Sequence, residues 1–324
     1  MQTLFQSLKA YRLIKTEYAE NKLSHAYMLL FDDTRNLRFA LKTFAKIFFC
    51  EDEFSPDFAR ISSLIDDEAF SDCLIFPAEK DKKIKVEDAE KIVEESLLTP
   101  VEGDKKLFVI GDFAEANVQT QNKLLKLLEE PPKGVYFLLG ATSPHSVLTT
   151  VLSRVKTLEI NGFETNLLTQ ALARIYGDKY EKNALSLCAA AADGSLGKAQ
   201  NMLEGGYYKN LLEDAKELCL CENYRLPSVV KTVGETKRQK EFLSVLRLIF
   251  RDALVLKAQG KAGEKNLLLQ AEKSALYEVA EKYSAHALLF AQDALAAAEK
   301  QIFTNANFAQ CMEICAAKIR KENK

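Results

Sequence analysis

Residues 31–38 are the first segment whose residue types could carry chemistry, because they lie between a short apolar run and an expected helix. A nucleotide-binding α/β domain has its phosphate loop here. Its glycines let backbone N–H groups surround the phosphates, a Lys reaches the β- and γ-phosphates, and Ser or Thr holds magnesium. This segment, Phe-Asp-Asp-Thr-Arg-Asn-Leu-Arg, contains neither glycine nor lysine. Its two carboxylates, Asp32 and Asp33, would repel phosphate. We therefore expect no tight ATP binding at this position.

A second candidate position is the end of the apolar segment Leu107 to Gly111. A nucleotide hydrolase carries an acidic pair there, for magnesium and for water activation. The corresponding pair in this chain is Gly111 and Asp112. Because the first carboxylate is missing, no metal ligand is evident, and we interpret Asp112 as a turn or helix-cap residue.

A third candidate is Arg154, which follows Ser153 just before an apolar segment. A guanidinium group can stabilise the negative charge that develops during phosphoryl transfer. Considered alone, an arginine at the start of a strand more often pairs with a carboxylate of its own fold. The three histidines are isolated in the sequence, so no Ser-His-Asp or Cys-His order indicates a hydrolase.

The seven cysteines are an odd number in a chain without a recognisable export signal, which predicts reduced thiols. Cys219 and Cys221 form a C-x-C pair, and Cys311 and Cys315 are spaced for one helical face. No second paired set accompanies them, as a structural zinc site would require. We expect small buried hydrophobic residues and no metal.

These candidates must be positioned by alternating strands and helices, because short apolar runs alternate with helix-period segments as far as residue 161. This pattern is typical of a parallel sheet that is covered on both faces, and it predicts an α/β fold. The expected strands are Tyr27 to Phe31, Cys73 to Phe76, Leu107 to Gly111, Val135 to Leu139 and Val155 to Ile160. The expected crossover helices are Arg38 to Phe49, Val86 to Leu97 and Gln119 to Glu130.

After residue 162 the strand signal disappears, and the remaining chain is expected to be all-α. Three short helices are predicted at Leu167 to Tyr176, Lys182 to Ala192 and Gly197 to Leu203. Longer amphipathic helices follow the pair Gly205 and Gly206, including one through Phe242 and two at 282–298 and 304–320. We interpret the glycine pair as a linker, which predicts three domains at 1–162, 163–206 and 207–324.

The composition is that of an ordinary globular protein, with 48% hydrophobic and 28% charged residues among 324. The formal net charge of -2 lacks the basic excess of a dedicated nucleic-acid binder, so protein partners are expected. No apolar run approaches the roughly 20 residues that span a bilayer, and the N-terminus shows no signal peptide. We expect a soluble, cytoplasmic protein without membrane contact.

The longest distinctive pattern covers residues 111–160. The helical sequence Q-N-K-L-L-K-L-L-E-E-P-P is followed by an apolar strand, a Ser-Pro turn and Leu-Ser-Arg-Val at 152–155. This order resembles the clamp-loader branch of the AAA+ superfamily, with Val155 replacing the cysteine of its Ser-Arg-Cys motif. Further similar segments are Ser-His-Ala-Tyr at 24–27, Ala-Asp-Gly-Ser at 192–195 and Phe-Arg-Asp-Ala-Leu at 250–254.

The resemblance implies an AAA+ α/β domain with helices on both faces, a small helical lid and a C-terminal helical collar that oligomerises. It also locates the departures from the family pattern. The phosphate-loop Lys falls at Leu37, its hydroxyl residue at Arg38, the first acid of the second motif at Gly111 and the sensor-two arginine at Gly197. The family's four-cysteine zinc module is not matched either, because the stretch from Cys50 to Cys73 contains only those two cysteines.

The resemblance therefore implies a degenerate nucleotide site, no cofactor and no ATP hydrolysis by this chain. The residues of that site are Asp32, Asp33, Asn36, Leu37, Arg38, Gly111 and Asp112. Loss of the phosphate loop while Ser-Arg is kept makes the delta-prime subunits of bacterial DNA polymerase III the most similar group. Arg154, with Ser153, would then act in trans on ATP held by a neighbouring subunit.

The partners that the resemblance implies are the other clamp-loader subunits, namely the gamma/tau motor and delta, in a hetero-oligomer. This chain would contact the sliding clamp and primed DNA through that complex. Three alternatives stay open: an active motor subunit, the clamp-opening subunit, and an unrelated enzyme or helical adaptor. The motor would need a phosphate loop near residue 37, and the clamp-opening subunit would not be expected to keep Ser153 and Arg154.

Overall fold

The structure is a computed structural model that describes residues 1–49, 56–79, 82–304 and 306–323. The chain divides into two compact units, Met1–Gly162 and Phe163–Lys324. The further boundary at residue 206 stays a prediction. Each unit is described by itself below.

The first unit is built on five parallel strands in the order β2-β3-β4-β1-β5. The strands are β1 Ala26–Leu30, β2 Cys73–Phe76, β3 Lys106–Asp112, β4 Val135–Ala141 and β5 Lys156–Glu159. The apolar runs of the sequence thus predicted all five strands, and the α/β expectation is confirmed. Because all strands are parallel, their carboxyl ends share one edge of the sheet and their amino ends the other.

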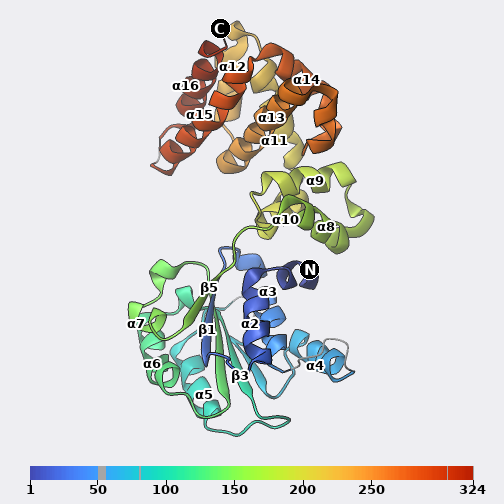
Figure 1. Cartoon of the computed structure of the whole chain (residues 1–324). Helices are drawn as coiled ribbons and strands as arrows, with labels where there is room; N and C mark the ends of the chain where they lie inside the picture. The colour runs from blue at the N-terminus through green and yellow to red at the C-terminus, as the bar shows by residue number, and fades with distance from the viewer. Residues whose placement is uncertain (50–55, 80–81, 305, 324) are drawn as a thin grey trace. The chain divides into compact units, whose positions relative to one another are not determined.

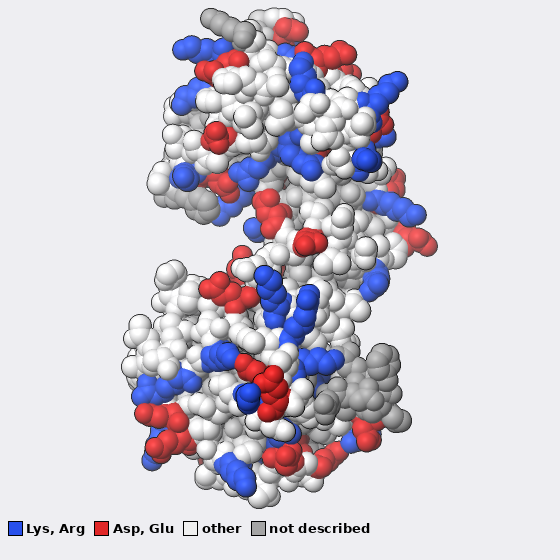
Figure 2. All heavy atoms as spheres, viewed as in Figure 1, with Lys and Arg blue, Asp and Glu red and all other residues white. Residues whose placement is uncertain are grey.

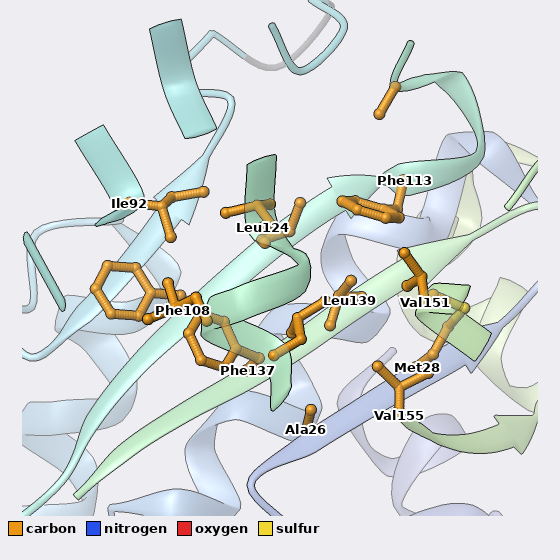
Figure 3. Packing of buried hydrophobic residues seen from close by; sticks show 14 of the residues in the cluster. Ala26, Met28, Ile92, Phe108, Phe113, Leu124, Phe137, Leu139, Val151 and Val155 are labelled. Atoms are coloured by element: carbon orange, nitrogen blue, oxygen red, sulfur yellow. The ribbon is translucent and has the colours of Figure 1, made fainter. Parts of the chain in front are cut away.

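Helices cover both faces of this sheet, with α2 and α3 on one face and α5, α6 and α7 on the other (Figure 1). The helices are α1 Gln2–Gln6, α2 Lys9–Ala19, α3 Thr34–Ala45, α4 Pro56–Asp66, α5 Val86–Ser96, α6 Val118–Glu129 and α7 Thr149–Leu152. Figure 3 shows the core beneath α5–α7, where Phe108 of β3 stacks on Phe137 of β4 with ring centroids 5.5 Å apart. Leu124 of α6 and Ile92 of α5 cover these rings, so burial of apolar area fixes both helices on the sheet.

Helix α3 begins at Thr34, four residues before the expected start at Arg38. The cause is local, because Asp33 accepts a hydrogen bond from the backbone N–H of Asn36 and so caps the helix. At its other end the helix tightens into a 3₁₀ turn at Lys46–Phe48. Within the segment 31–38, where a nucleotide-binding domain would have its phosphate loop, the residues from Thr34 onward therefore begin a helix.

The second unit is entirely helical within the residues that the structure describes. Its helices are α8 Thr165–Tyr176, α9 Lys182–Ala191, α10 Leu196–Gly205, α11 Tyr208–Leu220, α12 Leu226–Gly234, α13 Gln239–Gln259, α14 Lys273–Lys282, α15 Ala285–Phe303 and α16 Phe308–Lys321. Helices α15 and α16 begin later than expected, because Ser284 and Asn307 cap them. Gly206 ends α10 in the left-handed conformation, with φ of 66°.

Six cysteines lie in the described part of the chain, and all six are buried free thiols, as expected of small apolar residues. Burial raises the pKa of the Cys188 thiol to about 12. Cys50 lies outside the described residues. Among the described residues there is no group of three His, Cys, Asp or Glu side chains that could hold a metal ion.

Basic and acidic side chains lie interspersed on the face of each unit that Figure 2 shows. This distribution fits the nearly balanced composition. None of the helices, as far as the structure describes them, has the length and apolar character needed to cross a membrane.

Candidate functional site

The position of the expected phosphate loop is occupied by the capped start of α3. Asp33 accepts hydrogen bonds from Asn36 N at 3.2 Å and from Asn36 Nδ2 at 2.7 Å, and both side chains are buried. Asp32 is exposed. The backbone N–H of Asn36 is engaged by the Asp33 cap, and the segment forms a helix start in place of a glycine-rich loop.

Leu37, at the position of the phosphate-loop Lys, is buried against β4. A Cβ atom added to Gly140 would lie 2.9 Å from Cδ1 of Leu37 and 2.9 Å from Cδ1 of Leu41. Contact this close favours glycine on the strand, because a side chain there would force Leu37 or Leu41 to move. The side chain that would reach for phosphate is thus part of the helix–sheet contact.

Arg38 begins a row of three basic residues along α3 that are neutralised inside the fold. It donates to Glu68 from Nε at 2.8 Å and from Nη2 at 2.5 Å, and to the carbonyl of Pro77 at 3.0 Å. Lys42 donates to Glu68 at 3.3 Å, and Lys46 donates to Asp66 at 2.7 Å. The Arg38 guanidinium, with Lys42, lowers the pKa of Glu68 below its ordinary value. Arg38 therefore has its charge satisfied within its own unit.

Gly111 and Asp112 lie at a bulge between β3 and β4, where Ile110 pairs with Leu139 and Asp112 pairs with Gly140. A Cβ on Gly111 would come within 3.3 Å of the carbonyl oxygen of Phe76, so the position has little room for a carboxylate. Gly111 and Asp112 together therefore do not form the acidic pair of a hydrolase.

Asp112 has a structural set of partners. It caps the 3₁₀ turn Phe113–Glu115 by accepting from Ala114 N at 3.2 Å. It also accepts from Thr142 N at 3.0 Å and Thr142 Oγ1 at 2.6 Å. The interpretation of Asp112 as a cap residue agrees with this geometry. The seven residues of the predicted degenerate site gather near the carboxyl ends of β1, β3 and β4. The side chains of Asp33, Asn36, Arg38 and Asp112 are engaged in contacts within the fold, and Asp32 is exposed.

Arg154 lies apart from that cluster, at the opposite edge of the sheet. It precedes β5, which pairs in parallel with β1 from Tyr27 and Lys156 onward. Nearby, the carbonyl of Leu128 in α6 lies 2.9 Å from His25 Nε2, just before β1. The length of β1, about 15 Å at ~3.3 Å per residue, separates the two edges. Arg154 therefore lies at the other edge of the sheet from the residues of the predicted nucleotide position.

The guanidinium of Arg154 makes a local pair in the isolated chain. Nη2 lies 3.0 Å from Glu129 Oε2, and Nη1 donates to Thr150 O at 2.9 Å and to Ser153 Oγ at 3.3 Å. This is the pairing that an arginine considered alone predicts. The side chain of Arg154 remains 29% exposed, and Ser153 is exposed.

Gln121 of α6 sets the position of the segment that carries Arg154, and the sequence pattern did not single it out. Its side chain is buried, donates to Ala116 O and Ser146 O at 3.0 Å each, and accepts from Leu148 N at 2.9 Å. Leu148 is the N-cap of α7, which ends just before Ser153. From sequence alone, a glutamine in an amphipathic helix is expected on the surface. Only the tertiary contacts of Gln121 show that it positions the segment that carries Arg154.

Gly197, at the position of the expected sensor-two arginine, is buried in the first turn of α10. Without a side chain it offers no cation. The sequence predicts departures from the ATPase pattern at Leu37, Arg38, Gly111 and Gly197. In the structure Leu37 is buried, Arg38 is paired with Glu68, and the two glycines have no side chain.

The sequence of the chain is similar to those of bacterial replication proteins. A family model described as "DNA polymerase III, delta subunit" matches residues 6–164. The chain is 32% identical to DNA polymerase III subunit tau of Escherichia coli over 125 residues, which are 38% of this chain and 19% of that protein. It is 28% identical to DNA polymerase III subunit delta' of Bacillus subtilis over 163 residues, 50% of this chain and 49% of that one.

A similar solved structure is the gamma subunit-related protein of Thermotoga maritima, with 18% identity, a TM-score of 0.43 and coverage of 98% of this chain and 100% of that chain. The chain spans about a fifth of the length of the tau subunits that it matches. The parallel sheet and its flanking helices are of the AAA+ type. Through residues 6–164 the chain belongs to the DNA polymerase III delta/delta-prime family, within the clamp-loader branch of AAA+ proteins.

Proposed function

We propose that this chain is a clamp-loader subunit of the delta-prime kind, which binds no ATP tightly and completes the ATP site of a neighbouring motor subunit. The observation that carries the proposal is the separation of two features within the first unit. The nucleotide position at one sheet edge is filled by Leu37 and the Arg38–Glu68 pair, whereas Arg154 is accessible at the other edge.

Arg154 would act on the γ-phosphate of ATP bound by the neighbour. Negative charge increases on the phosphoryl oxygens as the bond to the leaving group breaks, and a guanidinium stabilises it through charge-assisted hydrogen bonds. Ser153 and Thr150 hold one side of the guanidinium, which reduces the number of conformations that it must lose on contact. Such an arginine does nothing for a nucleotide in its own chain, which agrees with the distance between the two sheet edges.

We further propose that residues 163–206 form a lid and residues 207–324 a collar that binds the other loader subunits. Helices α15 and α16 of this region expose Leu289 and Ile314, at 60% and 52% of their full surface. Exposed apolar side chains on helices are commonly buried in protein–protein interfaces. The assembled complex would place a sliding clamp on primed DNA, with this chain as a rigid, non-hydrolysing member.

Assembly is tested by size exclusion of the full chain mixed with motor subunits and delta. The full chain should elute with them as one complex, whereas a chain that ends at residue 206 should elute separately. An unrelated enzyme or adaptor would not enter the complex. If residues 1–206 still co-eluted stably, the collar assignment would be wrong.

A further inference from the structure

Glu129, the last residue of α6, holds the arginine that the proposed function assigns to a neighbour. The guanidinium is anchored by Glu129 on Nη2 and by Thr150 on Nη1. Its third nitrogen, Nε, is buried and has no hydrogen-bond partner among the described residues. An arginine built into a finished structural network rarely leaves such a nitrogen unpaired. The hydrogen bonding of the Arg154 guanidinium is therefore incomplete in the isolated chain.

The carboxylate of Glu129 and an incoming phosphate would compete for the same edge of the guanidinium. The side chains of Arg154 and Glu129 are 29% and 56% exposed, so an anion from outside the chain has access to the pair. Ion pairs this exposed are weak in water. A phosphate group carries more negative charge than a carboxylate, and both could not remain beside one guanidinium without repelling each other.

We propose that Glu129 is a competing counter-ion, which keeps Arg154 on its own subunit until the nucleotide phosphate of a neighbouring subunit displaces it. This inference rests on the trans role of Arg154 proposed above. Glu129 is a positioning residue in this scheme, because it does not touch the reacting atoms. It sets the fraction of molecules in which the Arg154 guanidinium is released from its own subunit and can reach the neighbour's phosphate. The exchange requires only side-chain rotations at the ends of α6 and α7.

The test uses loader complexes reconstituted with motor subunits and the full chain, and it measures kcat/KM for ATP. Glu129→Gln should raise kcat/KM about two- to fivefold, the range that corresponds to releasing an exposed ion pair. The rise should shrink as salt is added, because screening already weakens the pair in the wild type. In an Arg154→Ala background the same substitution should have no effect.

The matched control is Glu130→Gln. Glu130 is the next residue, is exposed, and has no side-chain hydrogen bond or ion pair within the described residues. It should leave kcat/KM unchanged. The proposal is overturned if Glu129→Gln lowers the rate or leaves it unchanged, or if its rise persists without Arg154. If Arg154→Ala leaves the rate of an intact complex unchanged, the trans role itself is wrong, and that result is distinct from the other three.

Discussion

Single side chains fill the segment where the family pattern predicts a nucleotide site. Arg38 stands where a phosphate loop has a hydroxyl residue, and its charge is met by Glu68 at 2.8 and 2.5 Å. Glu68 itself adopts a left-handed backbone with φ of 60°, an uncommon conformation for a residue with a side chain. The pair thus stabilises a turn that would otherwise be strained.

Glu68→Gln should lower the free energy of unfolding of the first unit by about 1.5–3 kcal/mol at pH 7, because it removes charge-assisted hydrogen bonds. The pKa of Glu68 is lowered in the folded chain by Arg38 and Lys42. The ionised Glu68 carboxylate therefore contributes its full stabilisation above the pKa of a glutamate in the unfolded chain, ~4.3. This contribution is lost as the pH falls through the lower pKa that Glu68 has in the folded chain. Urea unfolding of wild type and variant should show a gap at pH 7 that closes below about pH 4.

The control for this titration is Glu94→Gln, which changes an exposed carboxylate without a side-chain partner in the described structure. Its unfolding free energy should stay within about 0.5 kcal/mol of the wild type at both pH values. A Glu68→Gln deficit that persists undiminished at pH 3 would contradict the electrostatic account of this turn.

At the scale of elements, α6 connects the packed core to the segment that carries Arg154. Leu124 and Leu128 of α6 bury its apolar side on the sheet, and Gln121 fastens the start of α7. The helix ends at Glu129, directly before Glu130 and the Pro-Pro pair, so its last carboxylate is available to Arg154. One helix therefore fixes both the arginine segment and its counter-ion.

Gln121→Leu should destabilise the first unit by about 2–4 kcal/mol, because a fully buried unsatisfied group costs ~1–3 kcal/mol and partly buried groups cost less. The carbonyl of Ala116 would lose a buried hydrogen bond, and Ser146 O and Leu148 N would each lose a partly buried one. It should also reduce the Arg154-dependent ATPase of assembled complexes, since α7 loses its anchor. Denaturant unfolding and steady-state ATPase check the two effects. The exposed neighbour variant Asn122→Ala should change stability by no more than about 0.5 kcal/mol. Equal stability of Gln121→Leu and wild type would refute the anchoring role.

The elements that the sequence predicts well are those with a strong apolar signal. All five strands lie within the expected segments or next to their ends, because runs such as Leu107 to Gly111 can be buried only in a covered sheet. The early start of α3 was missed, since it depends on one side-chain cap at Asp33. The Arg38–Glu68 pair and the contacts of Gln121 could not be predicted, because they join residues that are distant in sequence and meet only in the folded unit.

At the scale of the whole molecule, the chain has two units with separate cores, and the family match ends close to the boundary between them. The first unit holds both the closed nucleotide position and Arg154. The second unit is all-helical in the described residues and is the proposed site of assembly. This division predicts that the effect of Arg154 appears only in a complex that the second unit brings together.

The most direct test of the central claim is the steady-state ATPase of motor subunits in complexes with wild-type chain, Arg154→Ala or Arg154→Lys. Wild type should stimulate hydrolysis, and Arg154→Ala should lower the stimulated rate about tenfold or more while size exclusion shows an intact complex. Arg154→Lys should restore little of the stimulated ATPase rate, because lysine lacks the planar, forked guanidinium group. Equal rates with wild type and Arg154→Ala would reduce the chain to a scaffold, and ATP hydrolysis by the chain alone would contradict the account of residues 31–38.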